Sequence, residues 1–558
     1  MNVAENTRGP HEIGLLLAGA MCALPFLVPY HQLPILSFYP EWLAAALGVS
    51  AALCVLAWRG GAVDPLPAPS LWLVVLALYF LARAFMGQPY PQIGALAACY
   101  VVFAALMVWL GAQLASGLGA ERVCTVLSVA LLAGALANAL AGTIQFYGRP
   151  ALLEDVVADL AGRRAYGNIA QANLYANYIA LGQCALIFLW LRRQVPTLAA
   201  LPIAVFLAAA GALSGSRIAI LFAGWIALFG VFSGRLVFGG DIRRLTLGAF
   251  AVAGCAVAMH FAVPWINESL GLHRAGESAL DRMSAFAAGE PRREIYSLGF
   301  RVFVSAPVFG VGLGAFPGAA FDVGLDPSLT RSGEVLSSPH NLLLHLLAES
   351  GVLGAALCLG ALCVWGWQLA RRLSDARPAL WWSLAVVGVE LLHSMLEFPF
   401  WSADFLAVAA LAMGVGLAPA SSSGPMATAM RAACLGGCAA LVLALVVLLG
   451  DYVRLDATRI TGSAVTLSSA ADAKRDAATL RAVARGLLAP VAEQWIVQSA
   501  PLDRRDLGEM LERSGRVATF WPSNAVITHR AAFLELDGRA EEARALRERA
   551  ARTFRRVR

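Results

Sequence analysis

The run NLLLHLLAESGVLGAALCLGALCVWGWQL, residues 341–369, decides the fold of this chain. A helix needs about 20 predominantly apolar residues to cross the hydrocarbon core of a bilayer, which is about 30 Å thick. This run exceeds that length and carries little charge, so it predicts a transmembrane helix.

The composition of the whole chain agrees with that prediction. Of its 558 residues, 59% are hydrophobic and only 14% are charged, whereas soluble domains have about 25% charged residues. The mean hydropathy is +0.68. These values indicate an integral membrane protein. The net charge of +6 comes almost wholly from arginine and partly reflects topology, so it is no argument for nucleic-acid binding.

Thirteen apolar runs predict an all-α, polytopic membrane helix bundle with about thirteen transmembrane helices. The first run is read as a retained helix, because its leader is not net positive and no A-x-A cleavage site follows. The runs cover residues 13–30, 41–58, 70–86, 92–116, 122–146, 169–191, 196–213, 217–234, 245–265, 341–369, 379–396, 402–418 and 431–450.

Arginines assign an orientation to these helices, because short cytoplasmic loops accumulate them. Clusters fall on alternate connections, which we assign to the cytoplasm: Arg192/Arg193, Arg235/Arg243/Arg244, Arg371/Arg372/Arg377 and Arg431, with Arg59 and Arg122 agreeing weakly. The N-terminus is then cytoplasmic. The loops near 147–168, 214–217, 266–339 and 397–401 and the tail from about 451 face outward.

The sequence predicts two domains, a membrane domain over residues 1–450 and a soluble helical domain over 451–558. Residues 266–339 form the longest break in the membrane pattern, and loops of that length are usually functional. Within this break, PRREIYSLGFRVFVSAPVFGVGLGAF (291–316) predicts an amphipathic helix at the outer interface, with apolar spacing at Ile295, Leu298, Val302 and Phe303.

The tail from about residue 451 is charged and alanine-rich, with helical spacing of apolar residues. Residues 521–554 have the length and the helix, Asp-Gly turn, helix layout of one tetratricopeptide-like unit. Such units need neighbours to bury their faces.

No metal or cofactor is expected from the sequence. All ten cysteines fall inside the predicted membrane runs, which disfavours disulfides and a cysteine metal site. The chain has no phosphate-binding P-loop, no Asp-x-Asp pair and no zinc-spaced His/Cys cluster.

His340, at the start of the 341–369 run, is the first candidate for chemistry. We expect Ser338 to cap the helix and Pro339 to lie in its first turn together with His340, where the helix dipole favours a neutral imidazole. A neutral imidazole at a water-accessible helix end can act as a general base. The alternative is a histidine that anchors the helix at the lipid headgroups.

Arginines on the outward side are the second group of candidates. Arg217 follows Ser-Gly-Ser at the outer end of a predicted helix, where a guanidinium and a helix N-terminus together suit phosphate. Arg292, Arg293 and Arg301 add positive charge on the long outer loop. The alternatives are snorkelling to the interface and contact with headgroups or solvent.

Other polar side chains lie near the same predicted face. Amide and phenol groups at the mouth of the sixth helix suit either sugar hydroxyls or helix capping; they belong to Tyr166, Asn168, Gln171 and Asn173. His345 and Glu349 are four residues apart, which favours a structural pair. His393 and Glu397 are also four apart, and either pair structurally or line the same cavity.

Several segments resemble the superfamily of O-antigen ligases and polymerases, and within it the PglL-like bacterial protein O-oligosaccharyltransferases. The segments occur in the order of that family: GNIAQANLYAN (167–177), SGSRIAI (214–220), RREIY (292–296) followed by PVFGVGLGAF (307–316), SPHNLLLHLLAESG (338–351) and HSMLEFPFW (393–401). The chain has Ala172 where that branch commonly has proline, and Tyr296 where tryptophan is usual.

The resemblance implies an enzyme of the bacterial inner membrane whose active site faces the periplasm, as does the C-terminal tail. Its partners would be an oligosaccharide linked to undecaprenyl diphosphate and an acceptor protein, a pilin or another periplasmic or outer-membrane protein. The enzyme would join the glycan to a Ser or Thr hydroxyl without a metal. His340 would be the base, Arg217 and Arg292 would bind the diphosphate, and Asn341 would be a supporting residue.

Three other functions remain open at this stage. An O-antigen ligase would use the same donor and the same three residues but would transfer the glycan to lipid A-core. A repeat-unit polymerase would lengthen a carrier-linked glycan. A transporter of lipid-linked glycan predicts inverted repeats and polar groups spread through the membrane depth. The sequence has no evident repeat, and its polar groups collect on one face.

Overall fold

A computed structural model describes residues 8–58, 63–232, 241–272, 292–324, 335–372, 377–417, 425–458, 460–461, 464–465 and 470–554. Arg59, Arg235 and parts of the predicted 266–339 loop (273–291 and 325–334) lie outside the described residues.

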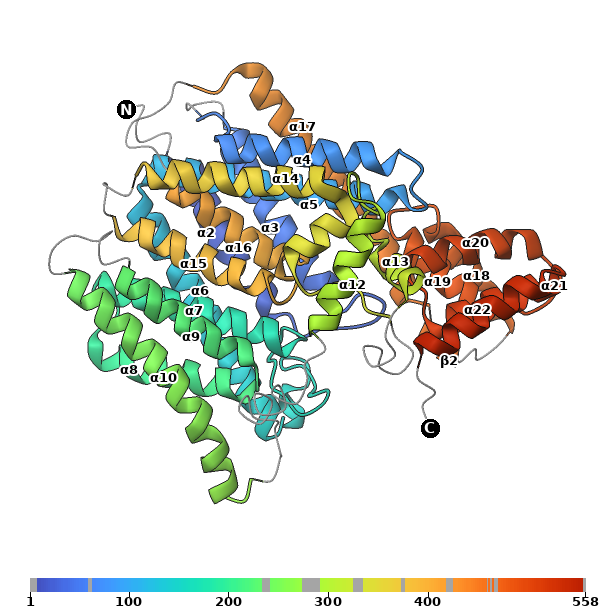
Figure 1. Ribbon diagram of the computed structural model, residues 1–558. Helices are drawn as coiled ribbons and strands as arrows, with labels where there is room; N and C mark the ends of the chain where they lie inside the picture. The colour runs from blue at the N-terminus through green and yellow to red at the C-terminus, as the bar shows by residue number, and fades with distance from the viewer. Residues whose placement is uncertain are drawn as a thin grey trace.

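Each of the thirteen predicted apolar runs is helical in the described chain, so the all-α fold class is confirmed (Figure 1). The helices are α2 (Arg8–Met21), α3 (Phe38–Leu56), α4 (Ala68–Ala84), α5 (Pro91–Leu118), α6 (Ala120–Tyr147), α7 (Ala172–Leu191), α8 (Thr197–Leu213), α9 (Arg217–Phe232), α10 (Asp241–Ser269), α14 (Leu342–Ala370), α15 (Pro378–Ser394), α16 (Ala403–Gly416) and α17 (Thr428–Asp456).

Eight helical spans among the described residues are long and apolar enough to cross a membrane. They are Gly9–Leu27, Phe38–Leu56, Pro91–Leu118, Ala120–Tyr147, Ala172–Leu191, Ile242–Ser269, Leu342–Ala370 and Thr428–Asp456. Shorter apolar helices pack among them: α4, α8, α9 and α16. The protein is therefore a multi-pass membrane protein. Among the described residues the only strands are β1 (Ile460–Thr461) and β2 (Ala464–Val465), which form a short antiparallel pair.

Arginines of the predicted cytoplasmic clusters gather at one end of the bundle. Arg192, after α7, lies 3.2 Å from Glu121 at the start of α6. Arg244, near the start of α10, donates to a carbonyl of α7 at 3.2 Å. Arg431, in the first turn of α17, donates to the carbonyl of Leu56 at the end of α3. The helix ends that the arginine clusters mark therefore lie at one end of the bundle, as the sequence predicts.

The opposite end of the bundle carries the long loop and the C-terminal helices (Figure 1). The amphipathic segment forms α12 (Arg292–Ser305), which packs against α14 and buries Ile295, Leu298 and Val302 as the spacing predicts. A second short helix, α13 (Phe316–Val323), follows it and contacts the C-terminal domain.

Helix α14 is broken at Gly351, whose φ of 67° and ψ of −173° are not helical. The glycine-rich loop before α13 fills the break. The Val311 N–H donates to the carbonyl of Ala348 at 2.9 Å, and the Val352 N–H donates to the carbonyl of Pro307 at 2.9 Å. These bonds satisfy backbone groups that the interrupted helix leaves without helical partners. Two sequence segments of the resemblance thus meet at this break.

Replacing Gly351 by alanine is expected to destabilise the protein, because a side chain there would have positive φ and its Cβ would lie 2.2 Å from the carbonyl oxygen of Val308. Backbone strain alone costs about 1–3 kcal/mol. A Cβ added at Gly366 of the same helix would meet nothing within 4 Å, so Gly366→Ala is the matched control. Thermal unfolding in detergent should show a lower midpoint for Gly351→Ala only. Equal midpoints for the two variants would contradict this account of the break.

The C-terminal domain is a row of antiparallel helices, α18 (Ala470–Val483), α19 (Ala489–Ser499), α20 (Leu507–Phe520), α21 (Asn524–Leu536) and α22 (Ala540–Thr553). The predicted helix, Asp-Gly turn, helix unit is α21 and α22. Consecutive helices of the row pack on one another, so α19 and α20 supply the neighbours that a single tetratricopeptide-like unit lacks.

This domain is fixed to the membrane helices at the end that carries α12 and α13. The hydroxyl of Tyr90, just before α5, donates to Glu493 of α19 at 2.7 Å. The guanidinium of Arg549 on α22 donates to Asp322 of α13 at 2.6 Å. Phe520, at the end of α20, packs edge-on against Tyr90. The C-terminal helices therefore contact both α5 and the outer loop.

Candidate functional site

His340 lies just before α14 and not inside its first turn, so the predicted cap is wrong. Asn341 is the N-cap, and its Oδ1 accepts the N–H of Leu344 at 3.1 Å. Ser338 instead accepts the N–H of His340 at 3.3 Å. His340 itself has a φ of 49°, a left-handed conformation that is costly for a side chain other than glycine. The chain turns at His340 because its imidazole is held by another segment.

That segment is the turn after α15, where Glu397 contacts His340. Nδ1 of His340 lies 3.0 Å from Oε2 of Glu397. The side chain of Glu397 is 10% exposed and that of His340 is 28% exposed. A carboxylate at Nδ1 favours the tautomer with the proton on Nδ1, which leaves the Nε2 lone pair available to accept a proton. Glu397 thus fixes the tautomer and the orientation of the imidazole, a partner that the sequence left open.

Glu397 is kept ionised by its partners. Burial alone would raise the pKa of Glu397, but the hydrogen bond and charge of His340, with His393 and Asn173, outweigh burial and hold the pKa below its usual value. Stabilisation from this carboxylate is therefore complete above its unfolded pKa of about 4.3 and is lost as the pH falls through the lower folded value. At neutral pH Glu397 is therefore ionised.

Asn173, in the first turn of α7, extends this pair to a second helix end. Its Nδ2 donates to Oε1 of Glu397 at 2.8 Å. Its Oδ1 accepts from the hydroxyl of Ser216 at 2.8 Å and from Nη2 of Arg164 at 2.9 Å. Asn173 therefore connects the pair His340–Glu397 to Ser216, the residue that immediately precedes α9.

Arg217 is the first residue of α9, as the sequence predicts. The turn before it needs Gly215, whose φ is 56°, and the hydroxyl of Ser214 accepts the N–H of Ser216 at 3.1 Å. Arg164 donates from Nε to the carbonyl of Ser214 at 2.7 Å. The N-terminus of α9, where Arg217 lies, and the guanidinium of Arg164 are thus at one end of the Ser216–Asn173–Glu397–His340 series, and a helix N-terminus with arginines suits a phosphate anion.

Helix α12 brings the other predicted arginines to the same region. Arg292 is its first residue and lies one turn before Tyr296, whose hydroxyl donates to the carbonyl of Met395 at 3.4 Å. Asn341 donates from Nδ2 to the same carbonyl at 3.2 Å. Arg292 therefore lies on a helix that reaches the turn carrying Glu397.

The two remaining arginines of α12 differ from Arg292. Arg293 is exposed. Arg301, also exposed, donates to the carbonyl of Gly324 after α13 at 3.2 Å, so it supports the loop rather than the turn of Glu397.

The polar residues at the mouth of α7 mostly hold their own loop. Gln171 is the N-cap of α7. Asn168 is buried and donates to the carbonyls of Leu27 and Val156, at 3.0 Å and 2.7 Å. The hydroxyl of Tyr166 donates to a backbone carbonyl of the preceding loop. Of the four residues predicted there, Asn173 joins the candidate site directly.

His393 and Glu397 do not pair with each other, which corrects one of the two readings of their spacing. Glu397 lies beyond the end of α15 and turns toward His340. His393 is fully buried in α15 beside Phe222, with no hydrogen-bond partner for either ring nitrogen among the described residues. His345 and Glu349 do lie together, with Nε2 and Oε1 3.3 Å apart and both side chains 5% exposed, as the structural reading predicts.

Sequence reasoning missed Ser216 and Arg164 as parts of the site. Both stand in or beside segments that the resemblance singles out, Ser216 directly before Arg217 and Arg164 just before the GNIAQANLYAN segment. Their roles depend on Asn173, which joins helices far apart in sequence. No group of three or more His, Cys, Asp or Glu among the described residues is placed to hold a metal ion.

The arrangement joins a histidine, a carboxylate and two helix ends that carry arginines within one polar network. Comparisons with known proteins match most of these residues to two families. Residues 202–359, which include Arg217, Arg292 and His340, match the family model described as O-antigen ligase. Residues 381–557, which include Glu397 and the C-terminal helices, match the model described as the C-terminal region of a virulence factor membrane-bound polymerase.

A curated relative, the general O-oligosaccharyltransferase of Acinetobacter baylyi, is 24% identical over 410 residues, which cover 72% of this chain and 69% of the relative. The two family matches include α9, α12, α14 and α15, whereas α7, which carries Asn173, lies outside both. The chain is therefore a membrane-bound glycosyltransferase that is similar to O-antigen ligases, to a membrane-bound polymerase and to a general O-oligosaccharyltransferase.

Proposed function

We propose that this enzyme transfers an oligosaccharide from an undecaprenyl-diphosphate carrier to Ser or Thr hydroxyls of proteins outside the cytoplasmic membrane, pilins among them. The observation that carries the proposal is the polar network from His340 through Glu397 and Asn173 to the N-terminus of α9, where Arg217 lies. It connects a base for a hydroxyl with a site for a diphosphate.

In the proposed reaction His340 accepts the proton of the acceptor hydroxyl on Nε2 while the hydroxyl oxygen bonds to the anomeric carbon of the glycan. The bond from that carbon to the diphosphate oxygen breaks, and the bonding electrons leave with the diphosphate. Negative charge therefore grows on the leaving group in the transition state. Fixed guanidinium groups at Arg217 and Arg292 stabilise that charge more than they stabilise the ground state, which accelerates the reaction.

Glu397 positions the imidazole of His340 and does not itself touch the reacting atoms. It holds Nδ1–H, keeps Nε2 directed to the acceptor, and stabilises the imidazolium that forms when the proton arrives. Glu397 is not the base in this reaction, since His340 and Asn173 already engage both of its carboxylate oxygens.

Replacing Glu397 by glutamine is expected to lower the rate of glycan transfer about 10- to 150-fold, which corresponds to loss of one charged hydrogen bond worth about 1.5–3 kcal/mol. The fall should appear in kcat at saturating donor, because donor binding does not use this carboxylate. Glu268→Gln, an exposed carboxylate near the end of α10, is the control. An unchanged kcat for Glu397→Gln would contradict the positioning role.

We further propose that the protein lies in the bacterial inner membrane with His340 on the periplasmic side, its N-terminus in the cytoplasm and its C-terminal domain, residues 451–558, in the periplasm. The gathering of arginines at the end of the bundle away from α12 supports this orientation. The C-terminal domain would then lie beside the site at the surface where acceptor proteins arrive.

An O-antigen ligase that glycosylates lipid A-core is the second candidate, because residues 202–359 match that family model. Mass spectrometry of periplasmic proteins and of lipopolysaccharide, from cells with and without the gene, separates the two. Our proposal predicts that glycopeptides disappear when the gene is removed. Loss of glycan from lipid A-core alone, with glycopeptides intact, would favour the ligase.

A further inference from the structure

An apolar cavity of about 380 Å³ lies among α4, α5, α14, α15 and α16, and we name it the α4–α5 cavity. Its wall is almost wholly hydrocarbon. The polar side chains Tyr100, His345 and Glu349 also line it, and the last two lie within 3.3 Å of each other. Phe520 of the C-terminal domain lies in its wall together with Gly314 of the outer loop. A pocket of this size and composition is typical of a ligand site.

The α4–α5 cavity lies next to the candidate active site. A small pocket beside Glu397 and Asn341 shares four wall residues with it, Leu342, His345, Phe400 and Trp401. The ring of His345 lies 4.3 Å from that of Trp401. One end of the cavity is therefore a single side-chain layer from the carboxylate that holds His340.

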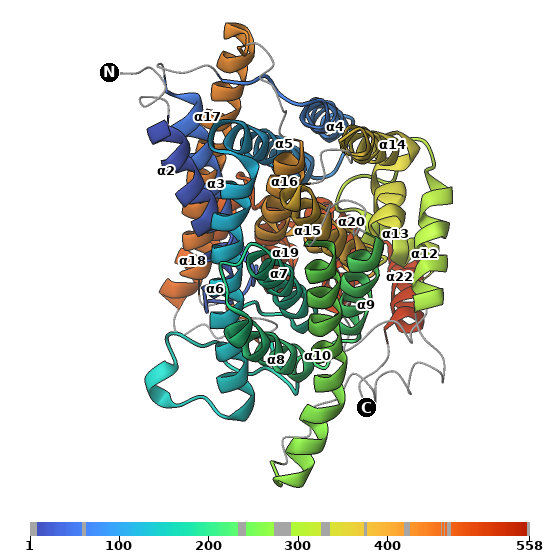
Figure 2. The ribbon, with the colours of Figure 1, turned by 90° about the vertical axis from the view of Figure 1, so that its left-hand side faces the viewer.

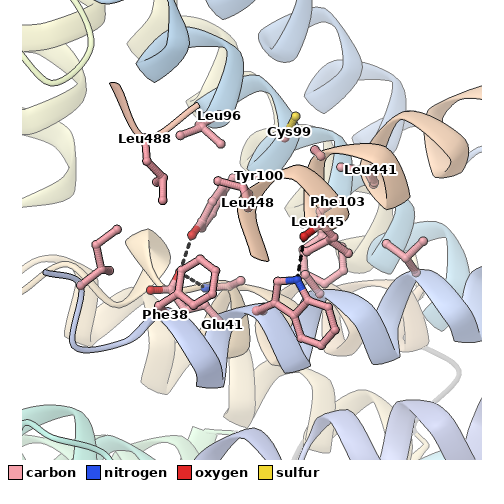
Figure 3. Close-up of a pocket in the computed structure, with 16 residues that line it drawn as sticks. Phe38, Glu41, Leu96, Cys99, Tyr100, Phe103, Leu441, Leu445, Leu448 and Leu488 are labelled. Carbon is pink, nitrogen blue, oxygen red and sulfur yellow. Dashed lines mark hydrogen bonds between the residues drawn. The ribbon is translucent and has the colours of Figure 1, made fainter. Parts of the chain in front are cut away.

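A second cavity, of about 150 Å³, lies on the other side of α5 between α3 and α17 (Figure 3). Leu96 and Tyr100 line both cavities and so divide them. The hydroxyl of Tyr100 points to Glu41, to which it donates a hydrogen bond, as Figure 3 shows. Leu488 of the C-terminal domain lines this second cavity as Phe520 lines the first. Leu96 and Tyr100 therefore bound the α4–α5 cavity on the side away from α14.

The size of the α4–α5 cavity decides what it can hold. A transmembrane helix about 10 Å wide and about 30 Å long fills about 2,400 Å³, several times the volume of the cavity, so the cavity does not admit a transmembrane helix of a partner. A flexible hydrocarbon chain fits, and the apolar wall suits it.

The position of the cavity decides which reactant such a chain belongs to. Helices α9 and α12, which carry Arg217 and Arg292, contribute none of its lining residues. Figure 2 shows α4 and α5 on one side of α15, with α9 and α10 on the other. The small pocket beside Glu397 shares wall residues with the cavity, so the cavity lies near the pair His340–Glu397, which handles the acceptor hydroxyl in the proposed function.

We propose, as an extension that rests on the proposed function, that the α4–α5 cavity binds an acyl chain of a lipid-anchored acceptor protein. The chain would fix the acceptor relative to the membrane and hold its Ser or Thr near His340. Acyl-anchored proteins are then preferred over soluble proteins and over proteins held by a transmembrane helix, because only the acyl chain enters the cavity.

The test uses the full enzyme in lipid nanodiscs with lipid-linked oligosaccharide and three forms of one acceptor: soluble, anchored by an acylated N-terminal cysteine, and anchored by a single transmembrane helix. Ala97→Phe on α5 and Ala361→Phe on α14 each fill the cavity from a different helix. Ala440→Phe on the exposed face of α17 is the matched control. The values of kcat/KM for the three acceptors are compared.

We expect wild-type enzyme to prefer the acyl-anchored acceptor over the helix-anchored one by about tenfold, through added binding at one linked site. Each cavity variant should remove that preference, and Ala440→Phe should retain it. Equal values of kcat/KM for the two anchored acceptors with wild-type enzyme would overturn the inference. An equal fall in kcat/KM for all three acceptors in both cavity variants would also overturn it. That result would assign the cavity to the carrier chain of the donor. Transfer to no protein, with transfer to lipid A-core, would instead overturn the proposed function.

Discussion

His340→Ala is expected to lower the rate of glycan transfer by about 10²- to 10⁴-fold, the usual contribution of a general base. The acceptor hydroxyl would then lose its proton to water while the diphosphate region and the helices remain in place. His340 is partly exposed and lies outside α14, so the variant should fold. Transfer is measured by gel shift or mass of the acceptor under initial-rate conditions.

Two controls separate chemistry from folding in that experiment. His529→Ala changes a histidine of the C-terminal domain that hydrogen-bonds within its own helix, and it should transfer at the wild-type rate. The thermal midpoint of His340→Ala should stay near that of the wild type, because residue 340 is partly exposed and lies outside α14. A large fall in midpoint together with lost activity would assign His340 a structural role.

Arg217→Ala is expected to lower kcat/KM by about 10²- to 10³-fold, as does removal of one group that stabilises developing negative charge. Arg217→Lys should recover only part of the activity, since an ammonium does not offer the paired donors of a guanidinium. Arg243→Ala, at an exposed residue of α10 near the other end of the bundle, is the control. Full activity of Arg217→Ala would remove the arginine from the diphosphate site.

The helices were largely predictable from the sequence, because a transmembrane segment must satisfy its backbone hydrogen bonds internally and cover its surface with apolar groups. Those two demands leave a local signal in each run, and the predicted runs end within a few residues of α5, α6 and α14. The break of α14 at Gly351 left no such signal. It depends on a loop some forty residues earlier that supplies the replacement hydrogen bonds.

The candidate site was predictable in its residue types and not in its pairing. His340, Arg217 and Glu397 were each selected from sequence, but the partner of Glu397 was open between His393 and a shared cavity. Spacing of four residues could not decide it, because Glu397 lies just past the last turn of α15, where the helix rule for such pairs ends. The contact with His340 joins the residue before α14 to the turn after α15, and helical spacing cannot reveal a contact between two such segments.

The N-cap of α14 is a second feature that depends on a tertiary contact and that the sequence does not decide. Ser338 and Asn341 are both good N-cap residues, and the sequence does not rank them. The structure selects Asn341 because the contact between His340 and Glu397 turns the chain one residue earlier. A local rule identified a helix start correctly to within a few residues, and a tertiary contact moved the histidine out of the helix.

The most direct test of the central claim joins purified enzyme, undecaprenyl-diphosphate-linked oligosaccharide and a pilin-like acceptor, and measures acceptor mass and released carrier together. The account predicts one glycan added to a Ser or Thr for each undecaprenyl diphosphate released, with both products lost in His340→Ala. Equal glycosylation by His340→Ala and the wild type, or carrier release with no glycan on the protein, would contradict it.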